Sequence, residues 1–275
     1  MKLTVRGRTW NLHERTYLMG VINVTPDSFS DGGQHFDLRS AVVRARQLAE
    51  EGADILDIGG ESTRPGHEPV PASVEMERVV PVIRAIRAEL DVPISIDTRK
   101  AEVARAAVAA GADMINDVTG LHGDADMAQT AAWSGLPVCL MHWAKVETGP
   151  DLMDRIIQGL SESVRLALAA GIPRDRLIVD PGVGFGKDVA GNLQILRCLG
   201  DLRELGLPIL IGTSRKSVIG KTLGLPVTDR VEGTAATVAI AIAHGASLVR
   251  VHDMQAMVRV SRMVDAIMGR TISPL

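Results

Sequence analysis

The stretch ISIDTRKAEVARAAVAAGADMIND, residues 94–117, contains the unit that decides the fold. It begins with the apolar run Ile94–Asp97, continues through a segment with helical spacing that ends at Gly111, and returns to a second apolar run, Met114–Asp117. Most apolar runs of this chain are nearly continuous and do not alternate between apolar and polar residues, which is typical of a parallel strand covered on both faces. Glycine suits the position after a helix because it adopts the left-handed conformation without strain. The stretch therefore predicts a strand–helix–strand unit of a parallel sheet.

The same unit recurs along the chain, as short apolar runs separated by longer segments of helical period. The runs lie at residues 17–23, 55–60, 94–97, 114–117, 138–142, 177–180, 208–213 and 247–252. A glycine closely precedes six of them, at Gly52, Gly111, Gly135, Gly171, Gly206 and Gly245. In the first helical segment, residues 38–51, we expect Asp37 to cap the helix and Gly52 to end it.

No linker, low-complexity stretch or change of composition divides the sequence, so we expect one domain spanning residues 1–275. Eight strand–helix units in about 250 residues are typical of an α/β fold of the (β/α)8 class, the TIM barrel. An open doubly wound sheet is the alternative, and the regularity of the eight units favours the barrel. Residues 1–13, in which two short stretches flank Arg6-Gly7, predict a small β-hairpin across the N-terminal mouth of the barrel.

Composition narrows the classes of partner. The 275 residues (29.3 kDa) are 46% hydrophobic and 23% charged, which is ordinary for a globular protein. The formal net charge is −3 and the pI about 6.2. This balance provides no basic field for nucleic acid and no polybasic patch for a membrane surface, so we expect neither partner.

The cysteines and the N-terminus indicate the compartment. Cys139 and Cys198 are too few for a disulfide framework or a four-cysteine zinc site, and we expect both to be reduced and buried. Residues 1–16 contain no apolar segment typical of a secretory signal. The longest apolar run, residues 235–243, is shorter than the roughly 20 residues that span a bilayer. We therefore expect a cytoplasmic protein.

Polar side chains follow the apolar runs at the point where each predicted strand ends. They are Asn23, Asp57, Asp97, Asn116 with Asp117, Met141 with His142, Asp180, Thr213 with Ser214, and Arg250 with His252 and Asp253. In barrels the chemistry lies at this end of the strands. Helix capping is the preferred interpretation for Asp117 and Asp253. Asp57, Asp97 and Asp180 are expected to converge on one mouth, which is costly unless they bind donors, cations or a metal.

The turn Gly212–Ser217 and several cations predict a place for an anion at the same mouth. Free N–H groups, hydroxyls and a helix start would form the anion pocket, where barrels often hold phosphate. Arg64, Lys216 and Arg250 add positive charge. The glycines of residues 182–186 lack the spacing of a dinucleotide-binding loop, so a nicotinamide cofactor is not expected. The ligand predicted by these features has a hydrogen-donating face and an anionic tail.

Several segments together resemble one family, dihydropteroate synthase, the folate-pathway enzyme that sulfonamides target. The longest are Met19-Gly-Val-Ile-Asn-Val-Thr-Pro-Asp-Ser-Phe-Ser-Asp-Gly-Gly33 and Asp57-Ile-Gly-Gly-Glu-Ser-Thr-Arg-Pro-Gly66. Shorter ones lie at residues 95–98, 115–117, 180–187, 213–217 and 249–253, and the resemblance extends from about residue 18 to 267. After the fifth strand this chain departs from the family's usual Met-His-Met-x-Gly-x-Pro loop and reads Met141-His-Trp-Ala-Lys-Val-Glu-Thr-Gly-Pro150.

The resemblance implies a Mg²⁺-dependent transferase of folate biosynthesis. It would join 6-hydroxymethyl-7,8-dihydropterin diphosphate to p-aminobenzoate and release 7,8-dihydropteroate and diphosphate. The residues implied as catalytic are Asp97, Lys216 and Arg250. The pterin would contact Asp97, Asn116, Asp180, Lys216, Arg250 and Met141. The diphosphate would contact Asn23, Asp57, Thr63, Arg64, Arg250 and His252, with Mg²⁺ on Asn23. The p-aminobenzoate would contact Ser214, Phe185 and Pro65.

The resemblance also implies two mobile loops, at about residues 23–35 and 60–70, and a homodimer formed through late helices. Two other functions fit part of the pattern. A methyltetrahydrofolate methyltransferase, another pterin-binding barrel, would share the carboxylates but has no need of the Asn23 loop or the 213–217 turn. A catalytically silent paralogue that binds pterins would be expected to have lost a catalytic or anion-binding group, and none is missing here.

Overall fold

A closed ring of parallel strands forms the centre of the molecule. The computed structural model describes residues 1–25, 34–62 and 68–271, with residues 34–37 as backbone only. The strands of the ring are β3 (Tyr17–Asn23), β4 (Ile55–Gly59), β5 (Ile94–Asp97), β6 (Met114–Asp117), β7 (Val138–Met141), β8 (Leu177–Asp180), β9 (Leu210–Ile211) and β10 (Leu248–Val251). They pair in the order β8-β7-β6-β5-β4-β3-β10-β9, and a parallel bridge from Val179 to Ile209 joins the two ends. The predicted (β/α)8 barrel is confirmed, and the open sheet is excluded.

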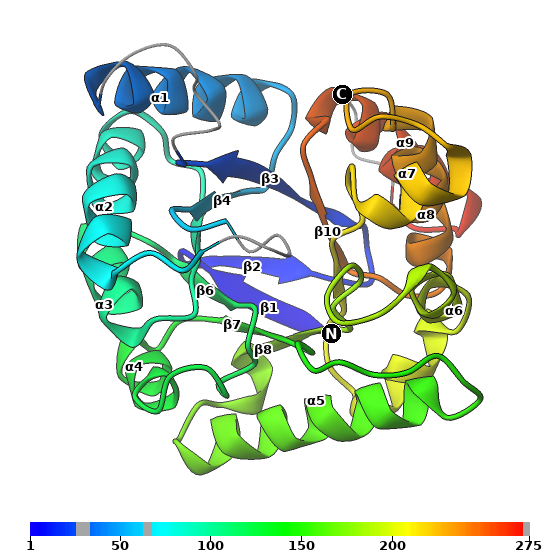
Figure 1. Ribbon diagram of the computed structural model, residues 1–275. Coiled ribbons are helices and arrows are strands. Elements are labelled where there is room, and N and C mark those ends of the chain that lie inside the picture. Colours follow the sequence, from blue (N-terminus) through cyan, green and yellow to red (C-terminus); the bar gives the residue numbers. More distant parts are fainter. Residues whose placement is uncertain (26–33, 63–67, 272–275) are drawn as a thin grey trace.

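Helices surround the ring (Figure 1). They are α1 (Gln34–Glu50), α2 (Ala72–Glu89), α3 (Ala101–Ala110), α4 (Met127–Ser134), α5 (Leu152–Ala169), α6 (Val189–Arg197), α7 (Ser217–Leu223), α8 (Val231–Ala243) and α9 (Met254–Ile267), with short 3₁₀ segments at Arg174–Arg176 and Leu199–Leu205. All six glycines expected before strands have positive φ, between 60° and 114°. Of the described residues, none belongs to a helix that could cross a membrane.

Two predicted elements differ from the structure by more than one residue at an end. Helix α1 begins at Gln34, so Asp37 lies inside the helix and is not at its N-cap position. Strand β9 is limited to Leu210–Ile211 because Pro208 has no N–H to donate to a ladder, although its carbonyl accepts from Val179 at 2.9 Å.

The N-terminal end of the barrel is closed by an apolar plug. Strands β1 (Lys2–Val5) and β2 (Arg8–Asn11) form the predicted antiparallel hairpin, which crosses the centre of the ring in Figure 1. Its apolar side chains pack against the first residues of the barrel strands in one buried cluster, formed by Leu3, Val5, Trp10, Leu12, Tyr17, Met19, Ile55, Met114, Cys139, Ile178, Leu210 and Leu248. A ligand can therefore reach the interior only from the C-terminal end of the strands.

Trp10 is expected to contribute strongly to this plug, because its ring is buried and stacks on Tyr17 with the centroids 4.6 Å apart. The Trp10→Ala variant should lose about 3–5 kcal/mol of unfolding free energy, since a large cavity would remain. Urea denaturation measures the loss. Arg8→Ala, on the same strand but exposed, is the control and should change stability little. Equal losses in both variants would contradict the role of the plug.

Candidate active site

The predicted polar residues meet at the open end of the barrel. Asp97 and Asp180 are the last residues of β5 and β8, and Asn116 is one residue from the end of β6. Asp57 lies inside β4 and Arg250 inside β10. The neighbouring strands are in register here, with Gly59 opposite Asp97 and Asp97 opposite Asn116. The continuous apolar runs thus bring side chains separated by more than 190 positions to one rim.

Arg250 joins two of the three carboxylates. Its Nε donates to Asp57 at 2.6 Å and its Nη2 donates to Asp97 at 2.7 Å. The Asn116 amide donates to the same Asp57 oxygen at 3.2 Å. Asp57 is completely buried and Asp97 is 8% exposed. The two carboxylates raise the pKa of Arg250, although burial acts in the opposite direction. The guanidinium therefore remains charged and compensates for two buried acids.

Each of these acids keeps one buried oxygen without a partner in the described structure, Oδ1 of Asp57 and Oδ1 of Asp97. Burial raises the pKa of Asp97 to about 7, with Arg250 opposing and Asp57 reinforcing the shift. Buried acceptors without donors are rare in folded proteins and are unfavourable. Two of them at the open end of a barrel indicate a site whose ligand supplies hydrogen-bond donors.

Asp180 and Lys216 form the other side of the rim. Asp180 Oδ1 accepts from the Gly182 N–H at 2.7 Å, and burial raises the Asp180 pKa while Lys216 opposes the rise. The Lys216 ammonium donates to the Val183 carbonyl. Burial lowers the pKa of Lys216 to about 8, and Asp180 acts against this shift. The two groups stabilise each other's charge at neutral pH.

Aromatic rings lie beside this lysine. Lys216 Nζ lies 4.5 Å from the centroid of the Phe185 ring, close enough for a cation–π contact. Trp143 packs against Phe185 with centroids 5.3 Å apart and the planes inclined by 37°. Met141, the buried last residue of β7, lies opposite Asp180 in the sheet. The loop in which this chain departs from its family thus supplies an aromatic side chain to the rim.

The half-buried Lys187 and the buried His142 form a pair that the sequence did not reveal as part of the site. Lys187 Nζ lies 2.9 Å from His142 Nδ1 and donates to the His142 carbonyl at 2.9 Å. Burial, with a smaller effect from Lys187, lowers the pKa of His142 to about 4. The pKa of Lys187 is lowered to about 7, again mainly by burial. The position of Lys187 at the end of the glycine-rich motif was the only signal available, because its partner is 45 residues away.

The turn between β9 and α7 differs from its prediction. The N–H groups of Arg215 and Lys216 are not free, because they donate to the Thr234 hydroxyl at 3.2 Å and the Thr213 carbonyl at 3.1 Å. The Ser214 hydroxyl accepts from the His252 N–H at 3.1 Å and lies 3.0 Å from His252 Nδ1. This turn therefore offers fewer donors to an anion than the sequence suggested.

Neither of the two predicted helix caps was confirmed. Asp117 accepts from the Thr119 N–H, the Thr119 hydroxyl and the Leu121 N–H, at 2.7–2.8 Å, but these residues form a turn, and α4 begins only at Met127. Asp253 stands at the N-cap position of α9 but makes no side-chain cap; its carboxylate binds the Arg215 guanidinium instead, with Arg215 Nε 2.9 Å away. A guanidinium within reach is a better partner for a carboxylate than a single amide.

Parts of the predicted diphosphate and p-aminobenzoate sites lie outside the described residues. This applies to Thr63 and Arg64 of the diphosphate site, to Pro65 of the p-aminobenzoate site, and to most of the first predicted loop. Asn23 ends β3 with a half-buried side chain. Among the residues that the structure describes, no three His, Cys, Asp or Glu side chains gather as a metal site. A single amide oxygen fits Mg²⁺ if substrate oxygens and water complete its shell, as is usual for this ion.

Glu61 anchors the described ends of the second predicted loop, and the sequence analysis did not identify it. It accepts from the Val70 N–H at 3.1 Å and from Arg99 Nε at 3.0 Å. Lys100 bridges Glu61 and the buried Glu75, at 2.5 Å from each. The lysine and arginine lower the pKa of Glu61, although burial opposes them. These ion pairs fix the segments on both sides of residues 63–67.

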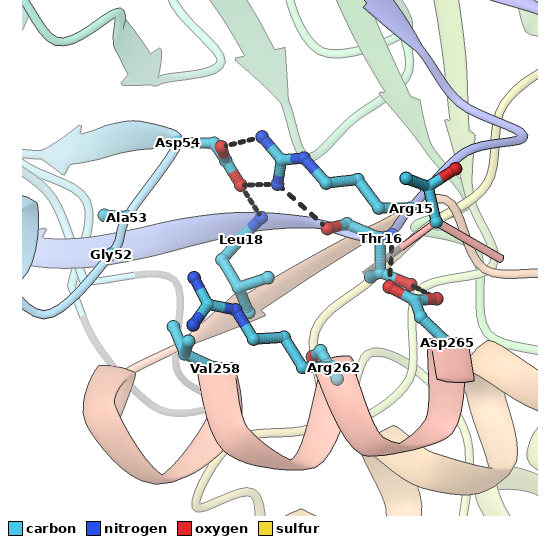
Figure 2. Close-up of a pocket in the computed structure, with 11 residues that line it drawn as sticks. Arg15, Thr16, Leu18, Gly52, Ala53, Asp54, Val258, Arg262 and Asp265 are labelled. Atoms are coloured by element: carbon cyan, nitrogen blue, oxygen red, sulfur yellow. Dashed lines mark hydrogen bonds and ion pairs between the residues drawn. The ribbon is translucent and has the colours of Figure 1, made fainter. Parts of the chain in front are cut away.

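A separate cavity of about 280 Å³ lies at the other end of the strands (Figure 2). In it Arg15 donates to Asp54 at 2.8 and 2.5 Å, and the Leu18 N–H donates to the same carboxylate at 2.8 Å. Asp265 accepts from the N–H and the hydroxyl of Thr16 at 2.7 and 2.9 Å. The two carboxylates are thus used to hold the start of β3 in place. None of the predicted site residues lines this cavity.

Comparison with known proteins assigns the family. A model of the pterin binding enzymes matches residues 19–252. Dihydropteroate synthase of Clostridium beijerinckii is 48% identical over 269 residues, which cover 98% of this chain and all of that protein. The chain belongs to the dihydropteroate synthase family. It is accordingly an enzyme, a transferase of the pterin-methyl group.

Solved members of the dihydropteroate synthase family have the same fold. The enzyme of Xanthomonas albilineans with 4-aminobenzoic acid is 46% identical, with a TM-score of 0.91 over 97% of this chain and 98% of the other. A complex of dihydropteroate synthase from the same organism with 7,8-dihydropteroate is 44% identical, with a TM-score of 0.90 over 98% and 99% of the two chains. Substrates of this enzyme class are therefore small molecules.

The ion pairs of Arg250 lead to a stability prediction. Arg250→Met should lower the free energy of unfolding by roughly 3 kcal/mol at pH 8, because two buried carboxylates would lose their cation. The loss should shrink below pH 7, where Asp97 binds a proton. Urea denaturation at several pH values measures it. Arg155→Met, which breaks the exposed pair with Asp151, is the matched control and should change stability little. A pH-independent loss would contradict the ionic role.

Proposed function

We propose that the chain catalyses the Mg²⁺-dependent condensation of 6-hydroxymethyl-7,8-dihydropterin diphosphate with p-aminobenzoate, giving 7,8-dihydropteroate and diphosphate. The observation that carries the proposal is the unpartnered buried oxygen of Asp97, the carboxylate that Arg250 holds in place. A pterin has N–H donors on its pyrimidine edge, and a diphosphate tail needs cations. The family membership of the chain supports the same reaction.

The pterin is proposed to bind deep in the mouth. Asp97 and Asp180 would accept its N–H groups, and Asn116 would contribute its amide. Bonds to ionised acceptors are roughly twice as strong as neutral ones, so they suit the recognition of one heterocycle. Lys216 would reach the pterin carbonyl and Arg250 would lie over the ring face. Met141 would form part of the apolar wall.

The diphosphate is proposed to bind nearer the surface of the mouth. The groups involved would be Asn23, Asp57, Thr63, Arg64, Arg250 and His252. Mg²⁺ bound by Asn23 and the phosphate oxygens would neutralise the charge that develops on the leaving group. His252 is held in place by Ser214, and Arg250 is already fixed by its two carboxylates.

The p-aminobenzoate is proposed to bind between the loops. Phe185 and Pro65 would cover its ring, and Ser214 would contact its carboxylate. Breaking the methylene–oxygen bond sends the electron pair to diphosphate and leaves a cation that the electron-rich dihydropterin delocalises. Asp97, buried beside the ring system, would stabilise this cation until the aniline nitrogen attacks. The aniline nitrogen forms the new C–N bond with its lone pair and then gives up one proton to water or to the released diphosphate, and no enzyme nucleophile takes part.

We further propose that the enzyme acts in the cytoplasm as a homodimer through α8 and α9. Several apolar side chains on these helices are exposed: Ile240 is 48%, Met263 is 62% and Ile267 is 69% exposed. The two helices pack against each other, so these side chains lie on one neighbouring pair of elements. Exposed apolar groups gathered in this way are typical of an interface with another protein surface.

An assay with both substrates tests the proposed reaction. Diphosphate release should require the pterin diphosphate, p-aminobenzoate and Mg²⁺ together, and should stop when a chelator removes the metal. Incubation with methyltetrahydrofolate and a methyl acceptor in place of the two substrates tests the methyltransferase alternative. Pterin binding without diphosphate release would indicate the silent paralogue and contradict the proposal.

Asp97 is expected to set the pH dependence. Its carboxyl must be ionised to stabilise the cation, and its pKa lies at about 7, so kcat/KM for the pterin should fall as the pH falls below 7. Asp97→Asn should keep the fold but lower kcat by about 10²–10³-fold, because the variant carries no negative charge. Steady-state kinetics from pH 5.5 to 9 measures both. Near-normal kcat in the variant would argue against the assigned role.

The placement of p-aminobenzoate is tested at two hydroxyls of one turn. Ser214→Ala should raise KM for p-aminobenzoate by about tenfold and KM for the pterin much less, because a bond to a charged carboxylate is lost. Ser217→Ala, at the exposed first position of α7, is the comparison. If only the Ser217 variant raises KM for p-aminobenzoate, the carboxylate lies at Ser217 and the proposed contact is wrong.

A further inference from the structure

The loop that follows β8 lies directly against the loop that follows β7. Gly182 and Gly186 have φ of +72° and +65°, which few side chains tolerate. A Cβ at Gly182 would lie 2.1 Å from the His142 carbonyl oxygen, and one at Gly186 would lie 2.8 Å from the carbonyl oxygen of Ala144. The Val146 N–H also donates to the Gly186 carbonyl at 3.1 Å. The two loops are therefore in backbone contact.

Lys187 is half-buried at this contact and binds both loops. Its ammonium donates to the His142 carbonyl at 2.9 Å and to the Pro181 carbonyl at 3.1 Å, with the Gly182 carbonyl at 3.4 Å. His142 Nδ1 lies 2.9 Å away. The low pKa of His142 keeps its ring neutral. An ammonium has three donors and no acceptor, so Nδ1 accepts in the tautomer that carries its proton on Nε2.

The His142 ring cannot move away from this lysine. A Cβ at Gly159 of α5 would lie 2.7 Å from the ring, so the helix packs tightly on its other side. On the β8 loop, Gly184 is equally close to Lys216, since a Cβ there would lie 2.8 Å from the Lys216 side chain. The lysine contact thus connects α5, through His142, to the loop that covers Lys216.

The contact between the two loops fixes the position of the Phe185 ring. Phe185 stands two positions before Lys187, and its ring lies between Trp143 of the β7 loop and the Lys216 ammonium. Either loop could shift alone if the contact between them were lost, and Phe185 would then leave Trp143. The groups proposed to read the pterin from the strands, Asp97, Asn116 and Asp180, would keep their places because the register of the sheet fixes them. Lys216, on the β9–α7 turn, would lose only its bond to the Val183 carbonyl.

We propose that Lys187 is a positioning residue for the second substrate: by joining the two loops it holds Phe185 where an aromatic amine acceptor must bind. This inference rests on the proposed function, in which Phe185 covers the p-aminobenzoate ring. Lys187 acts through Phe185 and not on the reacting atoms.

The test compares Lys187→Met with Lys145→Met, an exposed lysine of the β7 loop. Lys187→Met should raise KM for p-aminobenzoate by about tenfold or more, while kcat and KM for the pterin change less than about threefold. Lys145→Met should change none of these. Equal rises in both KM values, or a fall in kcat alone, would overturn the proposal.

A spectroscopic measurement without substrates separates this inference from the proposed reaction. The emission of Trp143 is obtained as the difference between each protein and its Trp143→Phe derivative. It should shift to the red in Lys187→Met and stay unchanged in Lys145→Met, because Trp143 would lose the Phe185 ring. An unchanged Trp143 spectrum would overturn the proposal even if the wild-type enzyme is active as proposed.

A second variant keeps the proposal testable if Lys187→Met does not fold. His142→Leu removes one acceptor of the ammonium and leaves the backbone carbonyls in place. It should produce the same red shift and the same selective rise in KM for p-aminobenzoate, but smaller. No change in either quantity would contradict a positioning contact between these side chains.

Discussion

The guanidinium of Arg250 between Asp57 and Asp97 is the interaction on which the mouth of the barrel depends. It joins β10 to β4 and β5 through bonds of 2.6 and 2.7 Å. Two carboxylates buried this deeply need a cation to compensate their charge. Each acid nevertheless keeps one buried oxygen without a hydrogen-bond donor in the described structure. The same ion pairs therefore hold the mouth together and leave acceptors for a ligand.

The lysines on the opposite side of the mouth lose their proton more easily than Arg250 does. Burial lowers the pKa of Lys216 to about 8 and that of Lys187 to about 7, while Asp180 opposes both shifts. A diphosphate or carboxylate that enters the mouth would stabilise the charged form of Lys216 further. An anionic ligand and these lysines would thus strengthen each other's binding, whereas Arg250 is charged whether or not a ligand is present.

The elements that could be predicted from the sequence are those determined by residues that are close together in the chain. Continuous apolar runs gave the bounds of β3 and β8 correctly, as is typical of buried parallel strands. The polar residue at the end of each run located the mouth. The N–H groups predicted to be free in the β9–α7 turn are not free. The Lys216 N–H donates to Thr213 within the turn, and the Arg215 N–H donates to Thr234 of α8, which no local pattern specifies. The contact of Lys187 with His142 could not be predicted, since nothing local specifies a partner 45 residues away.

The side chains proposed to bind the two substrates lie on different parts of the fold, mainly strands for the pterin and loops for p-aminobenzoate. The groups proposed to read the pterin lie on β5, β6 and β8, whose side chains are buried and whose register is fixed by the sheet. Phe185 and Trp143, by contrast, lie on loops whose positions depend on the contacts of Lys187 and on glycines with positive φ. Loops tolerate displacement more readily than a closed ring of strands. Changes near Lys187 can therefore alter the site of the second substrate while the acceptors for the first stay in place.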